Sequence, residues 1–228
     1  MASPFMYASP EQVMKDRADY ARRNIARGKP IVALEYADGV LLLAENPSAM
    51  LHKLSEIYDR IAFAGVGKYD EYERLRITGI RQADLKGYAY SREDVTARSL
   101  ANLYSQVLGQ IFTDSLKPFE VEILIAGVGE EDGDRAELYH VTFDGFMTDE
   151  QKFAALGGQA EELKQFLGEH YKETPDLLGA ISLGVEALRS AGNGDLATEQ
   201  VEGAVLDRKL PRRKFRRLDT SEIQAALA

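Results

Sequence analysis

Cysteine and tryptophan are absent from the 228 residues, and only three histidines are present. Without cysteine the chain has no disulfide bond, no thiolate metal site and no cysteine nucleophile. The histidines, His52, His140 and His170, lack the HExxH spacing of a zinc site, and zinc needs three or four clustered ligands. We therefore expect neither a bound metal nor a cofactor.

Long apolar runs are also missing. No run approaches the ~20 residues that span a bilayer, and the first residues lack the charged-then-apolar layout of a signal peptide. We expect a soluble, cytoplasmic protein with no membrane attachment, which the lack of cysteine also suits.

Basic residues are fewer than acidic ones, and the net charge is −9. Phosphate contacts need clustered lysine and arginine, so we expect no nucleic-acid partner. One basic run, Asp207 to Arg217 (DRKLPRRKFRR), stands against this excess of acid. Phe215 is its only aromatic residue, so we favour salt bridges within or between chains over nucleic-acid binding.

Common catalytic and cofactor motifs are missing as well. Gly65-Val66-Gly67 resembles part of a dinucleotide loop, but Asp70 stands where a third glycine is needed. We predict a tight strand-to-helix turn there. The chain has no GxSxG nucleophile elbow.

What is present begins with two different N-terminal segments. Residues 1–8 (MASPFMYA) are uncharged and have no periodicity. Ser9 then predicts a helix N-cap, with Pro10 at the first helical position and Gln12 closing a capping box. The helix should cover about residues 9–27, with Gly28 just past its end. Its apolar stripe is narrow, so we expect the helix on a surface or between subunits; the stripe consists of Met14, Ala18, Ala21 and Ile25.

An apolar β-hairpin is predicted directly after this helix, over residues 29–45 (KPIVALEYADGVLLLAE), turning at Asp38-Gly39. Further strands are predicted within 52–67, 119–129 and 201–207, with a second hairpin turning at Asp144-Gly145. Helices are predicted over 69–83 and 159–171, and after capping signals at 91–94, 174–175 and 219–222. Runs of strands followed by runs of helices indicate an α+β fold with two antiparallel sheets and helix pairs outside them.

Four stretches and the basic run carry a resemblance to a known family: SPEQVMKDRADYARRNIARGKPIVALEYADGVLLLAENPS, HKLSEIYDRIAFAGVGKYDEYE, ADLKGYAYSREDVTARSLANLY, PFEVEILIAGVG and PRRKFRR. Together they resemble the α-subunit of the bacterial (actinobacterial) 20S proteasome core particle, over essentially the whole chain. The resemblance implies a four-layer αββα sandwich of the N-terminal nucleophile hydrolase type with an extra N-terminal helix. It implies a gating tail at 1–8 and a single domain at 9–228.

The resemblance also bears on catalysis. Catalytic relatives of this fold begin with a threonine whose hydroxyl attacks the peptide while its own α-amine serves as the base. Aligning IVAL with their first strand puts Lys29, followed by Pro30, in the place of that threonine. Lys29 has no hydroxyl, and its nitrogen is part of a peptide bond, so we expect no catalytic residues. The alternative, an autoprocessed peptidase or amidohydrolase of the same fold, needs Ser, Thr or Cys at this point.

By the resemblance, the partners are neighbouring α-subunits in a heptameric ring and the proteolytic β-subunit, in an α7β7β7α7 particle for intracellular protein degradation. The tails would meet at the ring axis as a gate, in which we place Phe5, Met6, Tyr7, Ala8 and Pro10. Seven uncharged tails can crowd together where charged ones would repel each other. Without the resemblance, a disordered terminus would be the ordinary interpretation.

A pocket between neighbouring subunits is the last implied feature. In the family it receives the C-terminal carboxylate of activators, chiefly a ring ATPase. Lys53 of HKL would pair with that carboxylate, since a cation with free backbone N–H groups is what carboxylate capture requires. The other pocket residues implied are Gly28, Gly65, Val66, Asp19, Tyr20 and Arg22. The Tyr-Asp-Arg gate motif of eukaryotic and archaeal relatives is absent, and only Pro10 and Tyr20 match its cluster.

Overall fold

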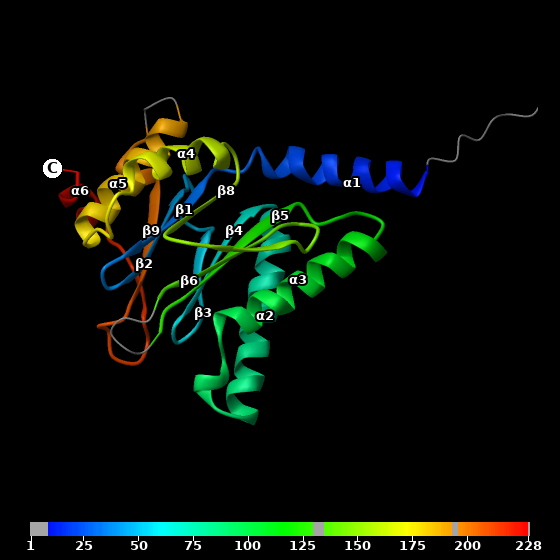
Figure 1. The fold of residues 1–228 in the computed structure, drawn as a ribbon, viewed down its shortest axis with the longest axis horizontal. Helices are drawn as coiled ribbons and strands as arrows, with labels where there is room; N and C mark the ends of the chain where they lie inside the picture. The colour runs from blue at the N-terminus through cyan, green and yellow to red at the C-terminus, as the bar shows by residue number, and fades with distance from the viewer. Residues whose placement is uncertain (1–8, 130–134, 193–195, 228) are drawn as a thin grey trace, which may run out of the picture.

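Two five-stranded antiparallel sheets form the centre of the computed structural model, which describes residues 9–129, 135–192 and 196–227 (Figure 1). Sheet A has the order β10-β9-β2-β1-β8 and sheet B the order β3-β4-β5-β6-β7. The strands of sheet A are β1 (Ile31–Tyr36), β2 (Gly39–Glu45), β8 (Phe153–Leu156), β9 (Val201–Asp207) and β10 (Phe215–Arg217). Those of sheet B are β3 (Leu54–Tyr58), β4 (Ile61–Gly67), β5 (Val121–Gly127), β6 (Glu137–Val141) and β7 (Met147–Glu150).

Helices cover the outer face of each sheet. Sheet A is covered by α4 (Ala160–His170) and α5 (Leu177–Ala191), and sheet B by α2 (Tyr69–Ala89) and α3 (Ala97–Asp114) (Figure 1). One apolar cluster lies between the sheets and one lies under each helix pair. The predicted α+β sandwich of two antiparallel sheets between helix pairs is therefore confirmed. No helix in the described ranges has the length and apolar character needed to cross a membrane.

The predicted hairpin lies in the middle of sheet A. Every residue of β1 and β2 is buried except Glu35 and Glu45, which are half-buried. The turn differs by one residue from the prediction: Tyr36 pairs with Gly39, so the turn is Ala37-Asp38 and Gly39 begins β2. Gly39 is needed for close approach, because a Cβ there would overlap the carbonyl oxygen of Leu206 on β9.

The N-terminal helix α1 (Pro10–Ile25) begins as predicted, with the Ser9 hydroxyl accepting from the Gln12 amide at 3.2 Å. The capping box does not close, because the Gln12 side chain donates to Asp16 instead. The expectation that the stripe avoids a core is wrong for half of the helix. Ala21 and Ile25 are buried in the cluster between the sheets, while Met14 is 37% exposed. Figure 1 shows the first turns of α1 extending beyond the sandwich.

Two helices begin at other residues than predicted, because more than one capping residue lies near each start. The Ser91 signal opens only a 3-10 turn, η1 (Arg92–Asp94), and Thr96 is the cap of α3. Asp176, rather than Thr174-Pro175, caps α5. Strand β9 and the capping box of α6 (Thr220–Ala225) formed as predicted. The predicted Asp144-Gly145 turn is shifted by one residue, because the Gly145 amide donates to the Thr142 carbonyl at 2.9 Å and the central residues are Phe143-Asp144. Strands β8 and β10 were not predicted, and β9 is therefore not the last strand.

Candidate functional site

The entrance to β1 is the position where a catalytic relative would carry its nucleophile. Lys29 lies here between α1 and β1, and its ammonium pairs with the Glu45 carboxylate at 2.6 Å. The Lys29 carbonyl accepts a hydrogen bond from the Lys53 ammonium, also at 2.6 Å. Both ends of this residue therefore make structural contacts, and neither supplies a hydroxyl.

A pocket of about 440 Å³ opens beside Lys29, between the end of α1, the start of α4 and the end of α5. Its charged lining residues are Arg27, Lys29, Glu45 and Arg189. Among the described residues that line it there is no serine, threonine, cysteine or histidine. The described part of this pocket therefore offers no hydroxyl or thiol nucleophile and no imidazole base.

Lys53, the proposed carboxylate partner, is half-buried just ahead of β3. Burial lowers the pKa of its ammonium to about 8, because the charged form loses solvation. Glu202 and Glu45 oppose this shift and Lys29 adds to it. The ammonium donates one hydrogen bond to the Lys29 carbonyl, which leaves donors for a further acceptor.

Glu202 on β9 holds the segment that carries Lys53. Its Oε2 accepts from the Lys53 backbone amide at 2.9 Å and from the Asn46 side chain at 2.7 Å. Its Oε1 accepts from the Leu54 amide at 3.2 Å and from Arg217 at 2.8 Å. Sequence reasoning missed this residue, because its partners are distant in the chain and no local pattern marks it.

Three of the predicted pocket residues meet Lys53 or one another. The Gly65 amide donates to the Lys53 carbonyl at 3.1 Å. A Cβ on Gly28 would lie 2.5 Å from Val66 Cγ1, so only glycine fits where the chain passes from α1 to β1. One premise is corrected: the Gly28 and Gly65 amides are not free, because they donate to Ile25 and Lys53.

The helix residues of the predicted pocket lie apart from Lys53. Asp19 and Arg22 pair with each other at 3.6 Å and line a depression along α1 together with Asp16 and Arg23. The Tyr20 hydroxyl donates to Glu120 at 3.4 Å. No hydrogen bond or ion pair within the described chain joins these three to Lys53. Of the predicted gate, Phe5, Met6, Tyr7 and Ala8 lie outside the described residues, and Pro10 starts α1.

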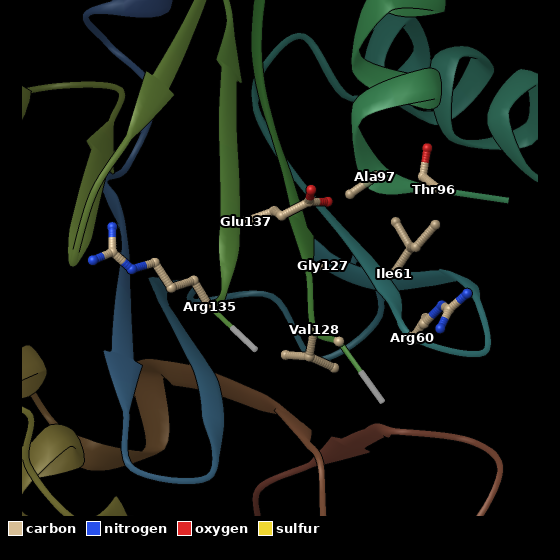
Figure 2. A pocket seen from close by; sticks show the side chains of 9 residues that line it. Arg60, Ile61, Thr96, Ala97, Gly127, Val128, Arg135 and Glu137 are labelled. Atoms are coloured by element: carbon tan, nitrogen blue, oxygen red, sulfur yellow. The ribbon is translucent and has the colours of Figure 1, made fainter. Parts of the chain in front are cut away.

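A second pocket, of about 320 Å³, lies where α3 begins against the end of sheet B. Figure 2 shows Arg60 and Arg135 on opposite sides of it, with guanidinium groups pointing away from each other, and Glu137 facing Ala97 at the helix start. A Cβ on Gly127 would lie 2.7 Å from the Ala97 Cβ, so this glycine permits the close packing of α3. The charged side chains that line this second pocket do not point toward a common centre. The described residues also contain no group of three or more His, Cys, Asp or Glu placed to hold a metal ion.

The basic run forms salt bridges within the chain, one of the two roles predicted for it. Four of its cations each pair with a carboxylate: Lys209 with Asp38, Arg213 with Glu56, Arg216 with Glu222 and Arg217 with Glu202. These pairs connect the β9–β10 region to sheet B, to α6 and to the β1–β2 turn. The run therefore fastens the edge of sheet A.

Comparison with known proteins agrees with the sandwich and its N-terminal helix. The family model described as "Proteasome subunit" matches residues 25–206. The chain belongs to the proteasome subunit family.

Relatives named proteasome subunit alpha match this proteasome-family chain along its whole length. That of Streptosporangium roseum is 53% identical over 228 residues, covering 100% of this chain and 88% of the relative. That of Thermomonospora curvata is 51% identical over 229 residues, covering 100% and 99%. That of Saccharopolyspora erythraea is 50% identical over 229 residues, covering 100% and 89%. The resemblance to actinobacterial α-subunits is therefore confirmed.

Proposed function

We propose that this chain is a non-catalytic α-subunit of a proteasome core particle. It forms the heptameric outer rings of a cytoplasmic particle, gates substrate entry to the chamber of proteolytic β-subunits and binds activators through their C-termini. The observation that carries the proposal is Lys29 at the entrance to β1, joined through a peptide bond to a packed upstream helix. Burial of Ala21 and Ile25 adds support, because removing α1 would expose the cluster between the sheets.

Pure chain without a β-subunit tests the absence of catalysis. Its intact mass should stay at 25.3 kDa, and it should not cleave a fluorogenic peptide. Co-expression with a β-subunit should give a particle that does. The rival, an autoprocessed peptidase or amidohydrolase, predicts cleavage ahead of residue 29 and activity in the pure chain.

The gate proposal concerns residues 1–8. Deleting them should raise hydrolysis of a short peptide several-fold in an assembled particle, because the axial passage would stay open. Electron microscopy must show intact rings in the deletion variant. Unchanged turnover in intact rings would contradict the gate.

The activator proposal concerns Lys53. Lys53→Met keeps the length of the side chain but removes the cation, so it should abolish activator-stimulated degradation and leave basal peptide cleavage intact. Lys172→Met is the matched control, since Lys172 is exposed and follows the C-terminal end of α4, whose N-terminal end lines the pocket beside Lys29. Normal stimulation in the Lys53 variant would remove the assignment.

A further inference from the structure

A pocket of about 490 Å³ lies at the opposite end of the strands from Lys29. Three segments build it: the β3–β4 turn, η1 and the loop between β9 and β10. Most of its lining residues are cations, namely Arg60, Arg92, Arg212, Arg213 and Lys214. Such a concentration is unexpected in a chain with a net charge of −9. Asp59 is the one acidic residue in the described lining, so positive charge predominates there. A concave site with an excess of one sign of charge raises the local concentration of oppositely charged ligands.

Described carboxylates pair with two of these cations. Arg92 makes a bidentate pair with Asp59, and Arg213 pairs with Glu56. The Lys214 ammonium instead donates to the carbonyls of Arg208 and Leu210, at 2.7 and 2.6 Å, so it keeps its charge while fixing the loop. The Lys214 amide donates to the Asp59 carbonyl at 2.7 Å, which joins the loop to the β3–β4 turn.

Arg212 stands out in this loop. It is exposed, makes no hydrogen bond or ion pair with any described residue, and has a φ of +61°. A left-handed backbone is unfavourable for a residue with a Cβ, and such strain is retained mainly where a site needs it. Glycine would adopt this conformation without strain, so folding alone does not call for arginine at this position.

The shape of the pocket restricts its ligand. The cations surround one cavity whose volume is within the ~300–1,000 Å³ range of small-molecule sites. Single-stranded nucleic acids and other extended polyanions bind instead along extended grooves. The only aromatic ring in its lining, Tyr58, is covered by the Arg92 guanidinium at 5.5 Å from the ring centroid. No ring in the described lining is open for stacking a base.

We propose that this basic pocket binds a compact polyanion that carries phosphate groups, with Arg212 as the residue that contacts it first. Arginine forks match phosphate oxygens in geometry, and Arg212 donates to no described carboxylate. This inference is independent of the proposed function, because it uses none of the residues at the Lys29 end.

Inorganic tripolyphosphate is the probe, titrated calorimetrically into the full chain, alone and assembled with its β-subunit. We expect saturable binding of one probe per chain that weakens steeply with added salt. Arg212→Gly should weaken binding at least tenfold while leaving the melting temperature unchanged or higher, because glycine relieves the strain at this φ. A stable Arg212→Gly variant with normal affinity would overturn the proposal.

Bulk charge is separated from the pocket by a matched pair of variants. Arg212→Glu and Arg81→Glu change the net charge equally, and Arg81 is exposed on α2 away from the pocket lining. Arg212→Glu should abolish binding, and Arg81→Glu should change the affinity less than twofold. Equal losses in both would mean non-specific attraction and would reject the site. Binding of oligoglutamate in preference to tripolyphosphate would reject the phosphate chemistry.

Discussion

At the Lys29 end of the strands the Glu202 side chain is only 10% exposed among its partners, whereas at the opposite end Arg92 and Arg213 are 69% and 68% exposed. The first end uses a buried carboxylate to fix backbone amides and side chains in one arrangement. The second has pairs that solvent reaches and a cation, Arg212, that pairs with no described carboxylate. Buried polar networks are costly to break and so define a geometry. Exposed ion pairs contribute little and can exchange partners.

The largest effect is expected at the buried end. Glu202→Ala leaves the Lys53 and Leu54 amides and the Arg217 guanidinium without their acceptor, so we expect a loss of about 3 kcal/mol in the free energy of unfolding. Urea denaturation of the purified chain measures it. Glu202→Gln keeps the shape and half of the acceptors, and it should lose less. A loss below ~1 kcal/mol for alanine would remove the distinction between the two ends.

This network also shows where sequence reasoning stopped. The bounds of β9 and the cap of α6 were predictable because alternation and a capping box are local patterns. Strand β8 was missed because four residues are too few for a pattern. The preceding Lys152, at φ +69°, turns the chain across to sheet A, which composition does not reveal. Lys53 was proposed as a site residue through family resemblance, whereas Glu202, which holds its segment from another strand, was recognised only in the tertiary structure.

The second prediction concerns Lys53 itself. Its pKa of about 8 means that its ammonium loses its proton well before an ordinary lysine. Acetylation of Lys53, followed by mass spectrometry across pH 7 to 11, should show its reactivity levelling off above about 8. Glu202→Gln should move that midpoint lower, because the Glu202 charge raises the pKa. A midpoint near that of exposed lysines would contradict the burial of the amine.

A third prediction uses another enclosed ionic cluster, around His140 on β6. Glu122 lies 3.5 Å and Glu150 3.9 Å from its ring, and Lys164 of α4 reaches Glu150 at 2.8 Å. Burial alone would lower the pKa of His140, but the two carboxylates outweigh it and the pKa is raised above 6.5. The pKa of Glu150 is lowered to about 2, first through its interaction with His140.

Because the folded-state pKa of His140 is raised, its stabilising contribution is complete below pH 6.5 and is lost as the pH rises through that folded value. The lowered pKa of Glu150 contributes above pH 4.5 and is lost as the pH falls toward 2. Replacing His140 by glutamine should therefore cost more stability at pH 6 than at pH 9, as measured by urea denaturation at each pH. An equal cost at both would show that the ring acts only by its volume.

The smallest effect is expected in the basic pocket. Arg213→Ala removes a pair with Glu56 that is largely exposed, so the free energy of unfolding should change by less than ~1 kcal/mol. The same urea measurement gives the value, and Glu56→Ala should give a similar one. A loss of unfolding free energy as large as that of Glu202→Ala would mean that ionic contacts stabilise both ends of the strands equally.

The glycines at the junction of α1 and β1 determine how motion can pass through the subunit. The Gly158 amide, just ahead of α4, donates to the Gly28 carbonyl at 2.9 Å, and the space for a Cβ on either Gly28 or Gly157 is filled by Val66. The joint therefore consists of a backbone hydrogen bond and the tightly packed Val66 side chain, with no free space around either. Tilting the outermost helix would have to displace strand β4 or the start of α4 as well. A displacement of α1 would therefore be transmitted directly to strand β4 and to the start of α4.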